Sequence, residues 1–182
     1  MIELPRPAVF LDRDGTLIED CGDLGTPHQV RFLPGVPETL LRLQQQFVLF
    51  IVTNQSAVAA GRLSMQQVNA VNSHVVESLN QIGVRVEEVF VCPHARADGC
   101  QCIKPKPHFL RLAEQKHRID LSRSFTIGDH PHDVEFACGV GATGIYVLTG
   151  HGAKHRADLA PQHRVAPSLP EALPWLLPAG IS

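Results

Sequence analysis

The chain has 182 residues, of which 44% are hydrophobic and 19% charged, and its formal net charge is −2. Lys and Arg are neither in excess nor clustered, which disfavours a nucleic-acid partner, and no apolar run approaches the length of a membrane span. The amino terminus lacks the pattern of a secretory signal. We therefore expect residues 1–182 to form a single domain, monomeric and cytoplasmic, without a membrane partner.

The first predicted element is a buried parallel strand over residues 8–11, which ends in the sequence Asp12-Arg13-Asp14-Gly15-Thr16. Side chains alternate along a strand, so Asp12 and Asp14 project to one side while Arg13 points away. Two carboxylates this close require a cation between them or a shared proton. The pattern predicts a divalent metal, an acid–base pair or both, and the alternative is a plain Asp-Gly turn.

Further along the chain, helices and strands alternate. After a polar loop over residues 19–34, strands are predicted at residues 48–52, 84–91, 125–127 and 145–148. Helices are predicted from Pro37 to before Phe47, over residues 107–116 and 131–138, and at 169–177 within a loop-like tail. A further helix begins after a Ser64 capping box and ends at Gly83, with Val68, Val71, Val75, Leu79 and Ile82 on its apolar face. This alternation predicts an α/β fold, a three-layer, Rossmann-like parallel sheet without a large cap insertion.

The second strand leads to Thr53-Asn54-Gln55-Ser56, which should reach the same sheet edge as Asp12. A hydroxyl, an amide and free backbone N–H groups suit the oxygens of a phosphoryl group. The alternative is a turn that caps the next element.

Two later loops supply further charged candidates. Lys104 lies between the third strand and the helix opened by Pro107, where its ammonium would neutralise Asp12 and a phosphoryl transition state. The alternative is a solvated surface lysine. Asp129 follows the fourth strand and would complete a magnesium site with Asp12 and the main-chain carbonyl of Asp14. Asp133 either caps a helix or orients Lys104 or a metal-bound water.

The loop over residues 92–102 contains four metal-binding side chains at short spacing, namely Cys92, His94, Cys100 and Cys102. Three sulfurs and one imidazole fit a closed, tetrahedral structural Zn²⁺ site. The alternative, a set of unrelated free thiols, fits the spacing less well. Zinc would rigidify this loop next to Lys104.

Taken together and in order, D-x-D-G-T, T-N-Q-S, C-P-H with C-x-C, K-P and G-D resemble the motifs of the haloacid dehalogenase-type (HAD) phosphohydrolases. The resemblance is to their zinc-containing branch, which includes heptose 1,7-bisphosphate 7-phosphatases and histidinol-phosphate phosphatases. It implies a Mg²⁺-dependent phosphatase with a structural Zn²⁺ that acts on a small phosphorylated metabolite, first D-glycero-D-manno-heptose 1,7-bisphosphate and alternatively histidinol phosphate.

The same resemblance implies roles for individual residues. Asp12 would be the nucleophile and Asp14 the proton donor and acceptor, while Thr53 and Lys104 would stabilise the phosphoryl oxygens and Asp129 would bind magnesium. It also implies substrate contacts from Arg13, Asp20, Cys21, Gly22, Asp23, Asn54, Gln55, Ser56, Ile103 and His130.

Three positions depart from the heptose-phosphatase pattern, because Ile103, Ala60 and His130 replace basic residues. Losing basic side chains weakens the assignment of a bisphosphate. Two rival functions are a non-catalytic module that holds a phosphorylated ligand and a phosphomutase. The intact Asp12, Asp14 and Asp129 argue against the first, and the missing cap argues against the second.

Overall fold

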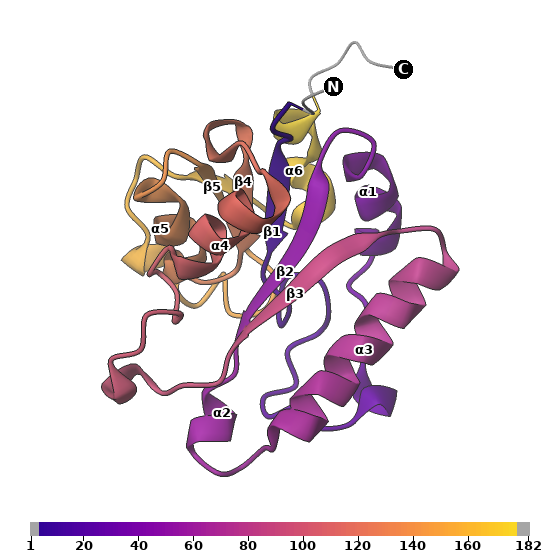
Figure 1. Cartoon of the computed structure of the whole chain (residues 1–182), viewed down its shortest axis with the longest axis vertical. Coiled ribbons are helices and arrows are strands. Elements are labelled where there is room, and N and C mark those ends of the chain that lie inside the picture. Colours follow the sequence, from indigo (N-terminus) through magenta and orange to yellow (C-terminus); the bar gives the residue numbers. More distant parts are fainter. Residues whose placement is uncertain (1–3, 178–182) are drawn as a thin grey trace.

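The computed structural model describes residues 4–177, whose strands form one six-stranded parallel sheet in the order β3-β2-β1-β4-β5-β6 (Figure 1). The strands are β1 (Ala8–Leu11), β2 (Val48–Asn54), β3 (Val86–Cys92), β4 (Phe125–Gly128), β5 (Thr143–Val147) and β6 (Arg164–Ala166). The helices are α1 (Val36–Leu43), α2 (Ser56–Ala59), α3 (Met65–Gln81), α4 (His108–His117), α5 (Pro131–Cys138) and α6 (Leu169–Leu176). Short 3₁₀ turns are η1 (Pro27–Gln29), η2 (Arg96–Asp98), η3 (Leu121–Arg123) and η4 (Arg156–Asp158).

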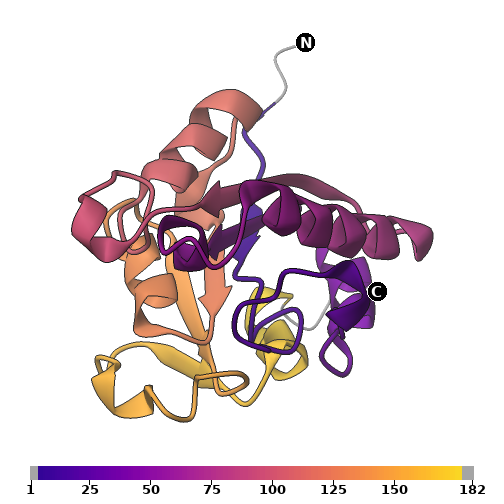
Figure 2. The same ribbon diagram turned by 90° about the horizontal axis from the view of Figure 1, so that it is seen from below.

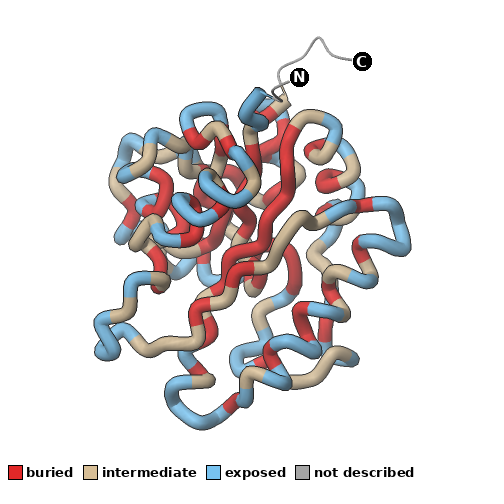
Figure 3. Tube along the Cα trace, viewed as in Figure 1, coloured by how far each residue is buried: buried red, intermediate tan, exposed pale blue. Residues whose placement is uncertain are grey.

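Strand β1 lies at the centre of the sheet and is buried on both faces, which explains its uninterrupted apolar sequence (Figure 3). Val9 and Leu11 face one side, where they pack against the apolar faces of α1, α3 and α6. Phe10 faces the other side, where it stacks on Phe50 and shares a core with residues of α4 and α5. Helices thus cover both faces, which confirms the predicted three-layer α/β fold.

Helix α3 begins where the sequence predicts. The Ser64 hydroxyl accepts a hydrogen bond from the Gln67 backbone N–H, and the Gln67 side chain accepts one from the Ser64 backbone N–H, so the capping box is complete. At the other end the expectation for Ile82 is wrong. Ile82 is 46% exposed because it follows the last helical residue and precedes Gly83, which has a positive φ of 88°.

Two elements were not predicted. Helix α2 forms directly after β2, where we expected only the loop that follows Thr53, and β6 adds a sixth strand within the segment predicted to be loop-like. Strand β6 has three residues, one of them exposed, so its sequence carries no alternating pattern of useful length.

All strands run in parallel, so their carboxyl ends lie at one edge of the sheet, which Figure 2 views from below. The loops after β1, β2, β3 and β4 meet there, as expected for the ligand-binding edge of an open α/β sheet. Within residues 4–177, no helix combines the length and hydropathy that a membrane crossing requires.

Candidate active site

The loop after β1 places two carboxylates at the sheet edge. Asp12 and Asp14 both line the same pocket. Arg13 is fully buried, and its guanidinium donates to the Asp14 carboxylate at 2.9 Å and to the Asn72 side-chain oxygen at 2.6 Å. Arg13 therefore fixes the orientation of the Asp14 carboxylate. Because Arg13 is buried, its position does not fit the substrate contact that we expected of it.

Gly15 allows this loop to approach Asp129. Its φ is +82°, in the left-handed region, and a Cβ at this position would collide with the Asp129 carboxylate. Both the backbone conformation and the close approach therefore require glycine.

Strand β2 ends in side chains that surround Asp14. The Gln55 amide donates to Asp14 Oδ2 at 2.8 Å and to Thr53 Oγ1 at 2.8 Å, and the Thr53 hydroxyl lies 3.5 Å from the same carboxylate. Thr53 and Asn54 line the pocket, whereas Gln55 is buried behind them. Asn54 also accepts a hydrogen bond from the Lys104 backbone N–H at 3.3 Å, which joins the loop after β2 to the loop after β3.

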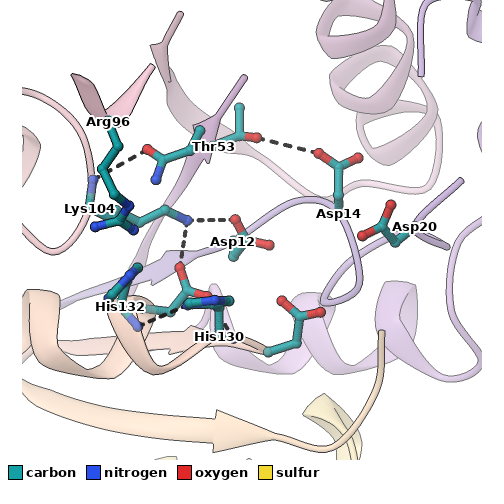
Figure 4. A pocket seen from close by; sticks show the side chains of 11 residues that line it. Asp12, Asp14, Asp20, Thr53, Arg96, Lys104, His130 and His132 are labelled. Carbon is teal, nitrogen blue, oxygen red and sulfur yellow. Dashed lines mark hydrogen bonds and ion pairs between the residues drawn. The ribbon is translucent and has the colours of Figure 1, made fainter. Parts of the chain in front are cut away.

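Lys104 occupies the floor of the pocket rather than the surface. Its side chain is 5% exposed, and its ammonium lies 2.6 Å from Asp12 Oδ1, 2.6 Å from Asp133 Oδ1 and 2.9 Å from the Val52 carbonyl oxygen (Figure 4). Burial lowers the pKa of Lys104, but the two carboxylates outweigh it and raise that pKa above its ordinary value. Lys104 is therefore charged, and the alternative of a solvated lysine is excluded.

Asp12, Asp129 and Asp133 form a carboxylate cluster, with one oxygen of each within 4.8 Å of the others. Burial raises the pKa of Asp12 well above its ordinary range, and the neighbouring carboxylates add to the effect against the opposing charge of Lys104. Burial likewise raises the pKa of Asp129 to about 6, although the His151 backbone N–H donates to it at 2.7 Å. Such mutual repulsion suits a site that a divalent cation completes, and oxygen donors are what Mg²⁺ requires.

The predicted zinc ligands converge as well. The Cys92 sulfur lies 3.2 Å from that of Cys102 and 3.6 Å from that of Cys100, and His94 Nδ1 lies 3.3 Å from Cys102. A tetrahedron with zinc–sulfur bonds of about 2.3 Å has edges of about 3.8 Å, so the four donors fit one ion after a small expansion. Burial raises the pKa of the Cys92 thiol, so zinc binding there must displace a proton.

The pocket has a volume of about 220 Å³ (Figure 4). The predicted residues that line it are Asp12, Asp14, Asp20, Thr53, Asn54, Lys104, Asp129 and His130. Residues for which we expected substrate contacts but which do not line it are Arg13, Cys21, Gly22, Asp23, Gln55, Ser56 and Ile103.

The reasons for the second group differ. Gln55 and Ile103 are buried, Ile103 within the core formed by β2, β3 and α4. The loop at Cys21 to Asp23 is exposed, and Asp23 instead forms an ion pair with Arg62 at 2.5 Å. Ser56 is exposed at the start of α2. These residues lie outside the pocket, and their substrate contacts stay predictions.

Three pocket residues were not predicted as site residues, namely Arg96, His132 and Asp133. Asp133 accepts a hydrogen bond from the His130 backbone N–H at 3.0 Å and pairs with Lys104 at 2.6 Å. The sequence offered a helix cap and the orientation of Lys104 as alternative roles for Asp133, and the structure shows contacts for both. Arg96, in the 3₁₀ turn η2, and His132, in the first turn of α5, reach the pocket only through the tertiary fold.

Comparison with known proteins agrees with this geometry. The sequence profile of the HAD-hydrolase-like family matches residues 101–172. A D-glycero-beta-D-manno-heptose-1,7-bisphosphate 7-phosphatase of Rhodopseudomonas palustris is 36% identical over 147 residues, which are 76% of this chain and 82% of that protein. The histidine biosynthesis bifunctional protein HisB of Blochmanniella floridana is 29% identical over 87% of this chain and 46% of its own length.

The chain is also similar in fold to a solved phosphatase structure. The D,D-heptose 1,7-bisphosphate phosphatase of B. bronchiseptica, complexed with magnesium and phosphate, superimposes with a TM-score of 0.87 at 31% identity, covering 96% of this chain and 99% of that one. Both the sequence and the fold of this chain are therefore those of a HAD phosphatase. The chain is a phosphatase and belongs to the family of the heptose 1,7-bisphosphate 7-phosphatases within the HAD-like hydrolases.

Proposed function

We propose that this phosphatase hydrolyses a small phosphorylated sugar through an aspartyl-phosphate intermediate, and that its substrate is D-glycero-D-manno-heptose 1,7-bisphosphate, cleaved at the 7-phosphate. The observation that carries the proposal is the convergence of Asp12, Thr53, Lys104 and Asp129 on one pocket from four separate loops. The relatives named above, whose names specify this reaction, support the choice of substrate.

In the first step, an oxygen of Asp12 attacks phosphorus and forms a new oxygen–phosphorus bond while the ester bond to the sugar breaks. Asp14 gives its proton to the departing sugar oxygen. The Lys104 ammonium, 2.6 Å from Asp12, and the Thr53 hydroxyl stabilise the phosphoryl oxygens.

In the second step, water attacks phosphorus, Asp14 takes a proton from that water, and the bond between Asp12 and phosphorus breaks. This returns Asp12 as a free carboxylate and Asp14 in its protonated form, so the cycle closes. Arg13 and Gln55, which hold the Asp14 carboxylate at 2.9 and 2.8 Å, keep it in position for both transfers.

We propose that Asp12 and Asp129 bind Mg²⁺, as the sequence predicts, and that Asp133 joins them, because one carboxylate oxygen of each lies within 4.8 Å of the others. The ion would supply positive charge to the phosphoryl oxygens. The main-chain carbonyl of Asp14 remains a further proposed ligand. We also propose that Cys92, His94, Cys100 and Cys102 bind a structural Zn²⁺ that holds the loop before Lys104.

A histidinol-phosphate phosphatase is the second candidate. The match to the HisB protein supports it, and so does the replacement of the Arg or Lys of the heptose pattern by Ile103, Ala60 and His130. A module that only holds a phosphorylated ligand has no need for Asp12 and Asp14 in the pocket, because their carboxylates repel a phosphate dianion unless they take part in catalysis.

The experiment is a phosphate-release assay with Mg²⁺ on heptose 1,7-bisphosphate, histidinol phosphate and p-nitrophenyl phosphate. We expect the highest kcat/KM on the heptose bisphosphate, with release of the 7-phosphate. A preference for histidinol phosphate would favour the second candidate. An absence of phosphate release from all three would contradict the proposal.

A further inference from the structure

The pocket contains two cationic side chains, of which one is paired with carboxylates and the other is not. Lys104 is engaged by Asp12 and Asp133 on the floor. Arg96 lines the same pocket from an exposed position, and among residues 4–177 its guanidinium has neither an ion-pair nor a hydrogen-bond partner. A permanently charged group that faces a pocket rich in carboxylates, yet pairs with none of them, is available for an anionic ligand.

The backbone that carries Arg96 is well fixed. Arg96 begins the 3₁₀ turn η2, in which the Asp98 carboxylate accepts from the Ala95 backbone N–H at 2.8 Å and Gly99 takes a φ of 63°. Lys106 donates to the carbonyl oxygens of Gly99 at 3.2 Å and of Cys100 at 2.5 Å, which closes the loop. The turn lies between the zinc ligands His94 and Cys100 in the sequence, so a metal there would hold it at both ends.

Two histidines complete the same part of the pocket from a different element. His130 is the N-cap of α5, and His132 lies in the first turn, with their ring centroids 4.5 Å apart. Both line the pocket with Arg96, and Figure 4 shows Arg96 and His132 beside Lys104. The backbone N–H groups at the start of α5 are used within its capping box, so the two imidazoles supply the hydrogen-bond donors to an anion.

Arg96 and His132 lie nearer the solvent than the residues that would bind the reacting phosphate. Lys104 and Asp129 are each 4% exposed, whereas Arg96 is exposed and His132 is half-buried at the mouth. A phosphoryl group that reaches Asp12 therefore lies at the floor, and the rest of an extended substrate passes Arg96 and His132 on its way out.

We propose, on the basis of the function proposed above, that Arg96 is a specificity-determining residue that binds the second phosphate of a sugar bisphosphate, with His130 and His132 as further donors. A guanidinium binds a phosphate with two parallel hydrogen bonds, and this contact is stronger than that of a lysine ammonium. Arg96 thereby supplies, from the loop after β3, the positive charge that Ile103, Ala60 and His130 lack.

The test compares heptose 1,7-bisphosphate with heptose 7-phosphate, which has the same scissile group but no second phosphate. Arg96→Met should lower kcat/KM for the bisphosphate by about 10- to 100-fold, mainly through KM, and leave heptose 7-phosphate and p-nitrophenyl phosphate within about twofold. Arg96→Lys should recover part of the loss. The matched control is Arg111→Met, on the exposed face of α4, which should change neither.

Inhibition of p-nitrophenyl phosphate hydrolysis by the two heptose phosphates measures the same contact without requiring their turnover. If Arg96→Met lowered kcat/KM equally for all three substrates, or for none of them, the inference would be overturned. So would a wild-type protein that binds the bisphosphate no better than the monophosphate. A wild-type protein that releases phosphate from none of them would instead contradict the proposed function.

Discussion

Replacing Lys104 by Met removes the ammonium from the floor of the pocket and leaves a side chain of similar length. In the folded protein, this ammonium lies 2.6 Å from both Asp12 and Asp133 and donates to the Val52 carbonyl at 2.9 Å. The substitution therefore leaves two buried carboxylates without their shared cation and one carbonyl without its donor. Both the free energy of unfolding and the rate of hydrolysis should fall.

The expected magnitudes follow from this geometry. Removal of one partner from a buried ion pair costs about 3–5 kcal/mol of stability, because the other charge remains buried. Loss of one group that stabilises transition-state charge lowers kcat by about 10²–10³-fold. The pKa of Asp12, already raised by burial, should rise further, so the protonated form becomes favoured in the folded state. The stability lost at pH 8 should therefore be partly regained as the pH falls.

The assay is urea unfolding of metal-free protein at about pH 8 and pH 5, together with initial rates in Mg²⁺. The matched control is Lys116→Met, an exposed lysine paired with Glu88, for which we expect a loss of about 0–1 kcal/mol and no change in rate. The double variant Lys104→Met/Asp133→Asn should recover part of the stability. A loss below about 1 kcal/mol for Lys104→Met, with kcat retained, would refute the reasoning.

Three further predictions concern other parts of the site. The pKa of Asp129 in the metal-free protein is raised to about 6, so its contribution to stability is present below its unfolded pKa and is lost as the pH rises through 6. Mg²⁺ should therefore raise the melting temperature most above pH 6. Asp129→Asn should remove this pH dependence of the Mg²⁺ effect. Arg13→Met should slow hydrolysis of sugar phosphates by about 10–100-fold, yet slow p-nitrophenyl phosphate hydrolysis little, because only a poor leaving group needs a proton from Asp14; equal effects on both would argue against this role. Cys100→Ser should lower the zinc content measured by atomic absorption and reduce thermal stability, and a full zinc content would contradict the assigned ligands.

Strands β1, β2 and β4 were predictable because each is a largely buried and mainly apolar run. Polar residues lie at or directly after the carboxyl ends of these strands, and the parallel topology brings them together. The bounds of β3 and β5 shift by about two residues from those predicted, since a strand end depends on its neighbour's register as well as on its own sequence. Strand β6 could not be predicted, because three residues form no period.

The candidate site divides in a similar way. Asp12 and Asp129 directly follow strands, Thr53 lies at the end of β2, and Lys104 precedes α4. Each belongs to a recognisable motif, and all four line one pocket. Arg96 belongs to no such motif, because its position in the pocket depends on the conformation of the loop between His94 and Cys100.

The roles given to individual side chains were harder to predict than their positions. The alternation of side chains along a strand correctly predicted that Arg13 points away from the pocket. Only the three-dimensional structure shows that its guanidinium donates hydrogen bonds to Asn72 and Asp14. For Asp133 the sequence left capping and the orientation of Lys104 as alternatives, and only the packing of α5 against β4 shows that it makes both contacts.

The most direct test of the mechanism is to trap the phosphorylated enzyme. Protein mixed with substrate and Mg²⁺ is quenched in acid within one turnover, and the quenched protein is reduced with borohydride, which converts an aspartyl phosphate to homoserine. We predict homoserine at position 12 in peptide mass spectra of the wild-type protein, and none in an Asp12→Asn variant that keeps its fold and zinc content but has lost turnover. Homoserine at another position, or normal turnover by Asp12→Asn, would contradict the account.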